Sequence, residues 1–291
     1  MSKIAQIWGR EILDSRGIPT VETACRLDTG QVAVASVPAG TSTGTHEALE
    51  LRDQDQKRYL GKGVLKAVEN VNSVLGPALL GVEGTDQEGV DNKLKDLDGT
   101  ENKSKYGANA ILSISLAVCK AASLAQKQNL YVWINFLAQR LGLKPALRIP
   151  TPLFNMINGG LHGAGNLDFQ EFHVIPASSK SFSQSLQAGV EIYLTIGDSL
   201  ARRGAIHSVG NEGGYAPNLF TNADALEVLV EAIKQTSYSL GRDVFLGLDV
   251  AANSFYKDGD YSIRDRSTSL SDDQLLDYYK ELVGNYHLAI L

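Results

Sequence analysis

Side chains able to transfer protons or bind cations recur at one kind of place in this 291-residue sequence: at or near the ends of apolar runs that we interpret as strands. His162 follows one such run, and Gln170 and Glu171 lie within the next. Glu212 comes just past a third run, and Asp249 closes a fourth. In a parallel α/β fold, catalytic groups collect at the carboxyl ends of the strands. The spacing therefore predicts one shared rim of polar groups.

The segment Gly210–Tyr215 carries the most informative carboxylate. Glu212 is flanked by glycines directly after an apolar run, and glycines allow the backbone to approach a ligand closely. A positioned carboxylic acid that protonates a leaving group contributes roughly 10²- to 10⁴-fold to a rate. The plain alternative is a turn that leaves Glu212 in solvent.

The other candidates have plain alternatives as well. Asp249 offers the hard oxygen ligands that Mg²⁺ prefers, but an aspartate here could equally cap a helix. His162 beside Glu171 could be a hydrogen-bonded core histidine next to a salt-bridged carboxylate. The loop from Pro38 to Gly44, which contains Ser42, could bring hydroxyls to an anion or metal, or could be a solvated turn.

The residue patterns indicate two regions that differ in rhythm. The first begins with a small antiparallel sheet and continues with helices. Its strands are predicted at Ile4–Ile12, Thr20–Leu27 and Gln31–Val37, and its helices at Gly63–Leu75, Asp86–Leu97 and Ala108–Gln126. The last helix is apolar around most of its circumference, which is typical of a buried helix.

Two prolines interrupt the segment Gly142–Pro150, which we interpret as a linker. Strands and helices then largely alternate, which predicts parallel strands joined by crossovers in an α/β sheet or a (β/α) barrel. The strands are predicted at Pro152–Ile157, Phe169–Ile175, Ala205–Val209, Val244–Asp249 and His287–Leu291, and the helices at Ser183–Arg203, Asn222–Leu240 and Asp272–Leu282.

The composition argues against nucleic-acid binding, a cysteine metal site and membrane insertion. The chain is 43% hydrophobic and 21% charged with a formal charge of -6, and its basic residues form no block that would neutralise nucleic-acid phosphates. Cys25 and Cys119 lack metal-site spacing and are expected to be buried, reduced thiols. No secretory h-region or stretch of about 20 apolar residues is evident, so we expect no membrane span and a cytoplasmic location.

Ordered motifs along the whole sequence resemble those of enolase. They are Asp14–Gly17, Gly40–Asp53, Gly107–Leu112, Asn158–Gly160, Gln170–Phe172, Glu212–Pro217 and Leu248–Ala252. The resemblance implies an α/β protein, with an enolase-type α+β domain over residues 1–141 and an incomplete enolase-type TIM-like barrel over residues 142–291. It also implies a homodimer or higher oligomer, and family members occur in the cytoplasm and also at cell surfaces or outside cells.

The same resemblance implies Mg²⁺-dependent, reversible dehydration of 2-phosphoglycerate to phosphoenolpyruvate, a step of glycolysis. Asp249 would bind the first Mg²⁺, and Ser42 would bind a second from a mobile loop. His162, Gln170 and Glu171 would line the substrate pocket, with His162 and Glu171 also among the catalytic groups. Glu212 would protonate the departing hydroxyl, while the metal ions stabilise the charge created when the proton alpha to the carboxylate leaves.

Some positions depart from the family pattern. Asn211 stands where Asp usually precedes the acid, and loss of that negative charge should lower the proton affinity of Glu212. Gly163, Ile18 and Ser254 replace the usual Ala, Asn and Glu.

The family strand that corresponds to His287–Leu291 leads into a Glu-Asp pair that contributes to the metal site. We therefore expect the adjoining coding sequence to continue with Glu-Asp-Pro and the rest of the barrel, and we expect these 291 residues to be inactive alone. One alternative is a non-catalytic, enolase-derived fragment that acts as an interaction protein. Another is an acid-sugar dehydratase of the same superfamily, which the Ser42 loop and the Glu212 segment match less well.

Overall fold

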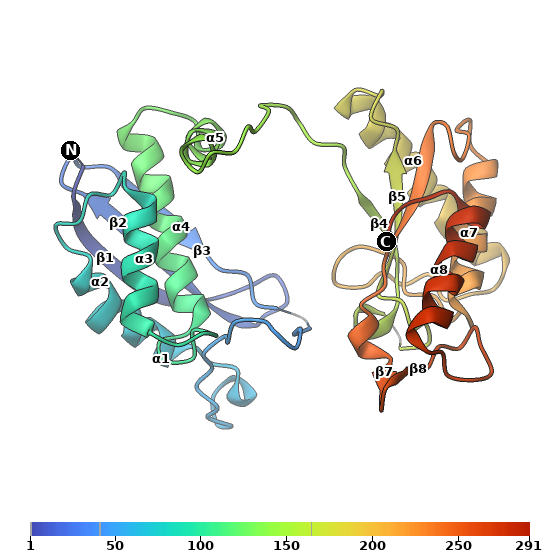
Figure 1. Ribbon diagram of the computed structural model, residues 1–291, viewed down its shortest axis with the longest axis horizontal. Coiled ribbons are helices and arrows are strands. Elements are labelled where there is room, and N and C mark those ends of the chain that lie inside the picture. Colours follow the sequence, from blue (N-terminus) through green and yellow to red (C-terminus); the bar gives the residue numbers. More distant parts are fainter. Residues whose placement is uncertain (1, 41, 164) are drawn as a thin grey trace. The chain divides into compact units, whose positions relative to one another are not determined.

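A computed structural model of the chain describes residues 2–40, 42–163 and 165–291 (Figure 1). The chain divides into two compact units, the first ending at Arg148 and the second beginning at Ile149. The division falls within the segment predicted as a linker, Gly142–Pro150, which contains no helix or strand. Each unit is described by itself below.

The N-terminal unit begins with an antiparallel sheet in the order β1-β2-β3. Its strands are β1 (Ile4–Leu13), β2 (Pro19–Leu27) and β3 (Val32–Ser36). The turn between β2 and β3 closes with a hydrogen bond from Gly30 N to Leu27 O, and Gly30 has a φ of 93°, which favours glycine. The predicted small antiparallel sheet and its hairpin are confirmed.

Helices cover this sheet. The first elements are the 3₁₀ turn η1 (Tyr59–Gly61) and the helix α1 (Leu65–Asn70), which continues into the π-helical turn η2 (Val71–Leu75) and α2 (Gly76–Ala78). The longer helices follow: α3 (Gln87–Asp98), α4 (Ala108–Ala125) and α5 (Leu130–Arg140). The long helix α4 packs against β2 and β3 and buries Ile114 and Val118 completely. Leu112, Leu116 and Leu124 are nevertheless exposed, so α4 is buried on one side and not around its whole circumference.

Helix α4 is the described helix that is long and apolar enough to cross a membrane by length and composition, but half of that window is buried within the protein. A core helix of a globular unit passes the same test, and the packing of α4 on the sheet fits that explanation.

The sequence analysis did not identify helix α5. Its residues include Tyr131, Val132, Trp133 and Ile134, whose aromatic and β-branched side chains favour strands in isolation. Only Trp133 is buried in this helix, so its apolar stripe is too narrow to stand out in the sequence.

The C-terminal unit is built on a four-stranded sheet in the order β4-β5-β6-β9. Its strands are β4 (Phe154–Asn158), β5 (Glu171–Pro176), β6 (Val244–Asp249) and β9 (Leu288–Ile290). Strand β5 is antiparallel to both β4 and β6, and only the pair β6 and β9 is parallel. The prediction that all these strands are parallel is wrong, because β4 and β5 follow one another without a helical crossover. The described strands do not close into a barrel.

Three long helices accompany this sheet (Figure 1): α6 (Phe182–Arg202), α7 (Asn222–Lys234) and α8 (Asp272–Tyr286). Each begins with a reciprocal capping box, including the one predicted at Thr221 and Asp224. Short elements complete the unit: the 3₁₀ turns η3 (Gly160–His162) and η4 (Ala252–Ser254) and the hairpin strands β7 (Tyr256–Lys257) and β8 (Asp260–Tyr261).

Helix α7 ends before the predicted Leu240. The hydroxyl of Thr236 donates to Ile233 O at 2.7 Å, and Asp243 accepts from Ser239 N at 3.0 Å. The first bond satisfies a carbonyl in the last turn of the helix and the second a backbone N–H beyond it, and such side-chain bonds compete with continuation of the helix.

The predicted strand Ala205–Val209 does not form. Ile206 and Val209 are more than half exposed, at 51% and 56%. Tyr215 takes the position beside β4 instead, in a parallel bridge with Ile157, and Val209 bridges to Tyr215 from the other side. The apolar segment Ala205–Val209 therefore does not pair with β4. An apolar run becomes a strand only where the edge of a neighbouring strand is free to form hydrogen bonds with it.

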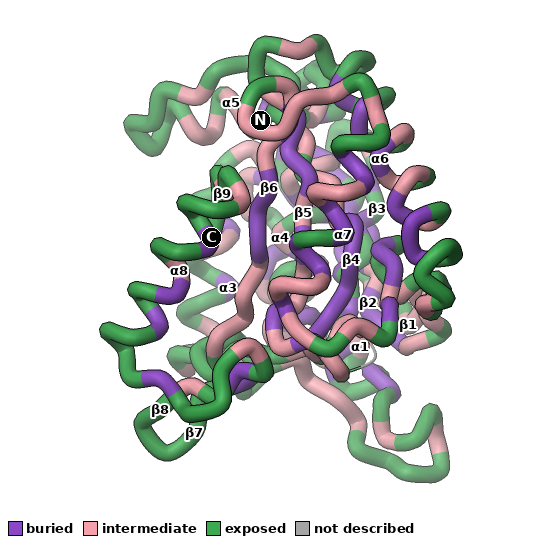
Figure 2. Tube along the Cα trace, turned by 90° about the vertical axis from the view of Figure 1, so that its right-hand side faces the viewer, coloured by how far each residue is buried: buried purple, intermediate pink, exposed green. Residues whose placement is uncertain are grey.

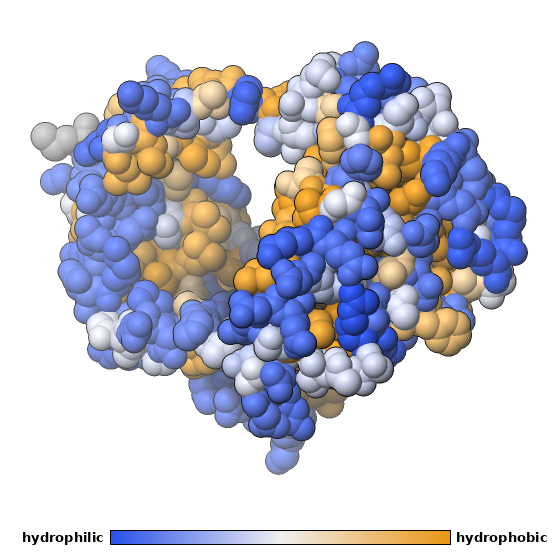
Figure 3. Space-filling model, turned by 45° about the vertical axis from the view of Figure 1, so that its right-hand side comes forward, coloured by the Kyte–Doolittle hydropathy of each residue, from blue (hydrophilic) through white to orange (hydrophobic). Residues whose placement is uncertain are grey.

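Burial follows the strands of the C-terminal sheet. Figure 2 shows buried positions along β4, β5 and β6, and Phe169 and Phe172 are completely buried against the helices. Burying such a side chain is worth about 1.5–3 kcal/mol relative to exposure. Figure 3 shows that apolar residues also remain on the surface. This core fixes the ends of the strands, where the polar candidates lie.

Candidate functional site

The strand register brings three polar residues into one row at the edge of the C-terminal sheet. Glu171 is paired with Asn158 of β4 on one side and with Asp249 of β6 on the other. Because β5 is antiparallel to its neighbours, its first residue lies beside their last residues. The predicted rim therefore exists, but Glu171 reaches it from the start of a strand and not from the end.

His162 joins two carboxylates at this rim. Its Nδ1 lies 2.8 Å from Glu212 Oε2 and 3.2 Å from Glu171 Oε1. The His162 side chain is only 8% exposed, whereas that of Glu212 is 36% exposed. One imidazole nitrogen carries at most one proton, so His162 donates to one of the two carboxylates at a time. The three predicted residues thus form a single hydrogen-bonded cluster.

Two amides from β4 complete the surroundings of Glu212. Asn155 Nδ2 and Asn158 Nδ2 lie 3.4 and 3.3 Å from Glu212 Oε2, the oxygen that also faces His162. Donors that converge on one carboxylate oxygen hold it in place. The three contacts from Asn155, Asn158 and His162 thus all involve the same oxygen of Glu212.

The loop that carries Glu212 is fixed to β4 through backbone hydrogen bonds. Tyr215 N donates to Met156 O at 2.9 Å, and Asn158 N donates to Tyr215 O at 2.8 Å. A Cβ atom at Gly214 would lie 2.0 Å from Asn158 Oδ1, so a larger residue there would displace the amide that contacts Glu212. The glycines predicted to permit close approach thus serve a contact within the protein.

Glu171 is the most strongly perturbed carboxylate of the rim. His173 Nε2 lies 2.8 Å from its Oε2, and this hydrogen bond is the main reason why the pKa of Glu171 is lowered to about 2. Partial burial of Glu171 acts in the opposite direction, while the contact with His162 adds to the lowering. Glu171 is therefore ionised throughout the neutral range.

Asp249 and Gln170 form the other end of the site. Gln170 Nε2 donates to Asp249 Oδ2 at 3.2 Å, and Ala251 N donates to Asp249 Oδ1 at 3.1 Å. The second bond closes a local turn over two residues and is not the helix cap of the alternative interpretation, because the 3₁₀ turn η4 that follows has Ala251 as its N-cap and no side-chain capping bond. Each carboxylate oxygen has two lone pairs, so both keep capacity for a cation.

The donor set at the rim fits Mg²⁺ at Asp249 better than at the His162 cluster. Ligand atoms of His162, Glu171 and Glu212 lie within 4.8 Å of one another, close enough to surround a metal ion. Mg²⁺ prefers oxygen ligands, and here one of the three atoms is an imidazole nitrogen. Asp249 instead offers carboxylate oxygens in the row next to Glu171, which suits a hard cation that keeps several waters.

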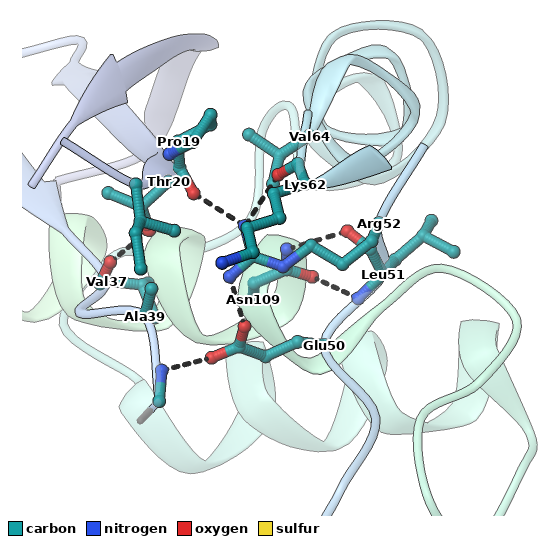
Figure 4. Close-up of polar contacts among 12 residues, drawn as sticks. Pro19, Thr20, Val37, Ala39, Glu50, Leu51, Arg52, Lys62, Val64 and Asn109 are labelled. Atoms are coloured by element: carbon teal, nitrogen blue, oxygen red, sulfur yellow. Dashed lines mark hydrogen bonds and ion pairs between the residues drawn. The ribbon is translucent and has the colours of Figure 1, made fainter. Parts of the chain in front are cut away.

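The Ser42 loop belongs to the N-terminal unit. Figure 4 shows how the base of this loop is held. Glu50 Oε1 accepts from Gly40 N at 2.9 Å, and its Oε2 pairs with Arg52. Ser42 itself is half-buried. Thr41, part of the same predicted loop, lies outside the described residues.

Further contacts fix the segment that follows this loop (Figure 4). Arg52 Nη1 donates to Pro19 O at 2.6 Å and to Lys62 O at 2.8 Å. Asn109 both accepts from Leu51 N and donates to Leu51 O, each at 3.1 Å. Buried and half-buried side chains therefore anchor the loop from behind.

Sequence reasoning missed two residues of the cluster, Asn155 and His173. A signal was present for His173, because residues two apart in a strand point to the same face and Glu171 was already a candidate. Asn155 gave no such signal, since its contact with Glu212 joins segments 57 residues apart in the sequence.

Comparison with protein-family models gives two matches that together cover most of the chain. The model of the enolase N-terminal domain matches residues 4–134, and the model of the enolase C-terminal TIM barrel domain matches residues 146–291. The two matches have the same order as the two structural units.

Proposed function

Because this chain belongs to the enolase family, a family of lyases, we propose that its rim of carboxylates serves the Mg²⁺-dependent dehydration of 2-phosphoglycerate to phosphoenolpyruvate. The observation that carries the proposal is the joint contact of His162 with Glu212 and Glu171, at 2.8 and 3.2 Å. This contact places the partly exposed carboxyl of Glu212 beside the carboxylate of Glu171, which stays ionised. Two carboxyl groups in different environments are expected where one acts as the acid and the other as a charged group.

Glu212 is the general acid in this proposal. Its side chain is 36% exposed, so a bound substrate hydroxyl can reach it, and the amides of Asn155 and Asn158 hold one of its oxygens. A β-hydroxyl is a poor leaving group unless it is protonated as it departs. Glu212 delivers that proton through the oxygen that is not engaged by the amides.

Glu171 and His162 support that step. Glu171 stays ionised beside Glu212, so the two neighbouring carboxyl groups can take different roles. His162 fixes the separation of the two carboxylates by bonding to one or the other. Gln170 would line the substrate pocket, and its amide donates to Asp249.

Asp249 would hold the first Mg²⁺, and Ser42, by the family resemblance, would bind the second. When bound, the metal supplies positive charge that stabilises the substrate carboxylate as the proton alpha to it leaves. The proposal extends to a cytoplasmic, glycolytic role and to a homo-oligomer, both taken from the family resemblance.

The acid role of Glu212 is tested by separating proton removal from dehydration. In protein expressed from the complete reading frame, Glu212→Gln keeps the shape of the side chain but cannot deliver a proton. We expect this variant to lose phosphoenolpyruvate formation, by at least about 10²-fold, yet still to exchange the C2 proton of 2-phosphoglycerate with solvent deuterium.

Glu88→Gln is the matched control, because Glu88 is an exposed carboxylate on α3 in the N-terminal unit. It should retain both reactions at the wild-type rate. Loss of exchange together with dehydration in Glu212→Gln would remove the assignment. A wild-type protein without Mg²⁺-dependent phosphoenolpyruvate formation would refute the proposed function itself.

A further inference from the structure

A second row of residues lies directly behind the rim on the same face of the sheet. His173 is paired with Asn155 of β4 and with Gly247 of β6. It stands two residues after Glu171 on β5, so both side chains point to the same face. The layer behind the reactive carboxylates therefore consists of an amide, an imidazole and a glycine.

His173 and His162 divide the two oxygens of Glu171 between them. His173 Nε2 lies 2.8 Å from Oε2, while His162 Nδ1 lies 3.2 Å from Oε1. The side chain of His173 is 13% exposed and that of Glu171 is 19% exposed, so solvent competes little for either bond. Holding one oxygen in this way fixes the torsion of the carboxyl and hence the direction of the other oxygen.

Gly247 faces His173 across the pair of strands β5 and β6. A Cβ atom at this position would lie 3.6 Å from His173 Cβ, which is an ordinary van der Waals contact, and 2.9 Å from Ile175 Cδ1, which would have to move. The close packing at Gly247 therefore involves Ile175 and leaves the contact between His173 and Glu171 undisturbed.

The other ring nitrogen of His173, Nδ1, indicates that the contact of Nε2 with Glu171 is kept although the burial of Nδ1 lowers the stability of the fold. In the part of the chain that the structure describes, the Nδ1 atom of His173 is buried and has no hydrogen-bond partner. Burying an unsatisfied polar atom is unfavourable, and an apolar side chain of similar size would avoid the penalty. Such local violations are expected where a residue serves the site.

We propose that His173 is a positioning residue for the proposed dehydration: through its Nε2–H it orients the carboxylate of Glu171, and through Glu171 it places His162 against Glu212. This inference rests on the proposed function, because the reaction supplies the need for a fixed geometry. His173 does not touch the substrate itself. Its effect is to keep the acid, the imidazole and the ionised carboxylate in one arrangement.

The test uses protein expressed from the complete reading frame, as for Glu212, and compares two substitutions that differ in the Nε2 donor. His173→Gln places an amide N–H near the position of Nε2, whereas His173→Leu has no donor and also removes the unsatisfied Nδ1. For His173→Leu we expect kcat to fall by roughly 10- to 100-fold with KM within about threefold of wild type, as for other supporting contacts. For His173→Gln we expect kcat within about threefold of wild type.

Stability separates positioning from a merely structural role. In His173→Leu the lost hydrogen bond and the removed orphan nitrogen offset each other, so the urea midpoint of the C-terminal unit should stay near the wild-type value. Wild-type kcat in His173→Leu would overturn the proposal. So would equal impairment of the two variants, or a loss of kcat that is matched by a loss of folded protein.

A spectroscopic readout keeps this inference distinct from the proposed function. The chain has five histidines, and long-range ¹H–¹⁵N correlation spectra of ¹⁵N-histidine-labelled protein report which ring nitrogen of each is protonated. The His173 signal, identified by its absence in His173→Gln, should show protonated Nε2 and should shift in Glu171→Gln. If wild-type protein fails to dehydrate 2-phosphoglycerate, the proposed function fails. A His173 signal without protonated Nε2, or one unaffected by Glu171→Gln, overturns the positioning contact instead.

Discussion

Asn222, the first residue of α7, is a completely buried amide that ties three segments of the C-terminal unit together. Its Oδ1 accepts from the backbone N–H groups of Asp168 and Phe169, each at 3.0 Å. Its Nδ2 donates to the carboxylates of Asp168 and Asp265, at 3.0 and 2.6 Å. The segment that it holds leads directly into Gln170 and Glu171, so the amide supports the rim from a distance.

Replacing Asn222 by Ala removes all four contacts at once. The backbone N–H of Phe169 is buried and that of Asp168 is partly buried, so both lose an acceptor that water cannot readily replace. An unsatisfied buried donor costs about 1–3 kcal/mol, and two of them sum to roughly 2–6 kcal/mol. Since one donor is only partly buried, we expect Asn222→Ala to lower the unfolding free energy of the C-terminal unit by about 2–4 kcal/mol.

The chain offers a built-in way to assign the loss to one unit. Its two tryptophans, Trp8 and Trp133, both belong to the N-terminal unit. Urea unfolding followed by tryptophan fluorescence therefore reports that unit, while far-UV circular dichroism reports both. In Asn222→Ala the circular dichroism transition of the C-terminal unit should move to lower urea, or be lost, while the fluorescence transition stays in place.

Asn285→Ala is the matched control, because Asn285 lies on α8 with an exposed side chain. It should change stability by no more than about 0.5 kcal/mol, as is usual for surface positions. An Asn222→Ala protein with both transitions at wild-type urea concentrations would refute the reasoning. A shift of the fluorescence transition alone would refute it equally.

Two further predictions concern the same unit. The pKa of Glu171 is lowered to about 2 in the folded protein from an ordinary value of 4.5, so its contribution to stability is present above pH 4.5 and is lost as the pH falls towards 2. Glu171→Gln should therefore flatten the loss of unfolding free energy between pH 5 and about pH 2 relative to wild type, and equally steep profiles would contradict this. Thr221→Ala removes the side-chain acceptor at the start of α7 and should cost about 1 kcal/mol in the same urea assay, whereas an unchanged midpoint would show that the capping box contributes nothing.

Local sequence patterns were sufficient to predict an element wherever its conformation depends on residues that are close in sequence. The predicted strand Val244–Asp249 coincides with β6, and the capping box at Thr221 starts α7 as expected. Gly30 with its positive φ closes the predicted hairpin. In these cases the determining contacts lie within a few residues, so alternation and capping chemistry contain the necessary information.

The direction of β5 and the membership of the cluster needed the tertiary structure. The predicted elements already included no helix between the first two strands, but the general alternation was interpreted as parallel pairing, and the register of β5 against both neighbours shows that this prediction is wrong. Likewise, the run Ala205–Val209 is apolar enough for a strand, but Tyr215 occupies the position beside β4. Pairing depends on which edge is available, and that is a property of the assembled sheet.

The sequence by itself determined which residue types could do chemistry here: His162, Glu171, Glu212 and Asp249 stand out by type and by position at or near the ends of apolar runs. Only the tertiary structure decided which of them touch, because Glu212 meets His162 across 50 residues and Asn158 across 54. It also added His173, whose Nε2 reaches Glu171 because the two side chains share one face of β5. Side-chain chemistry is local to a residue, whereas distances between residues far apart in sequence are set by how strands pair and helices pack.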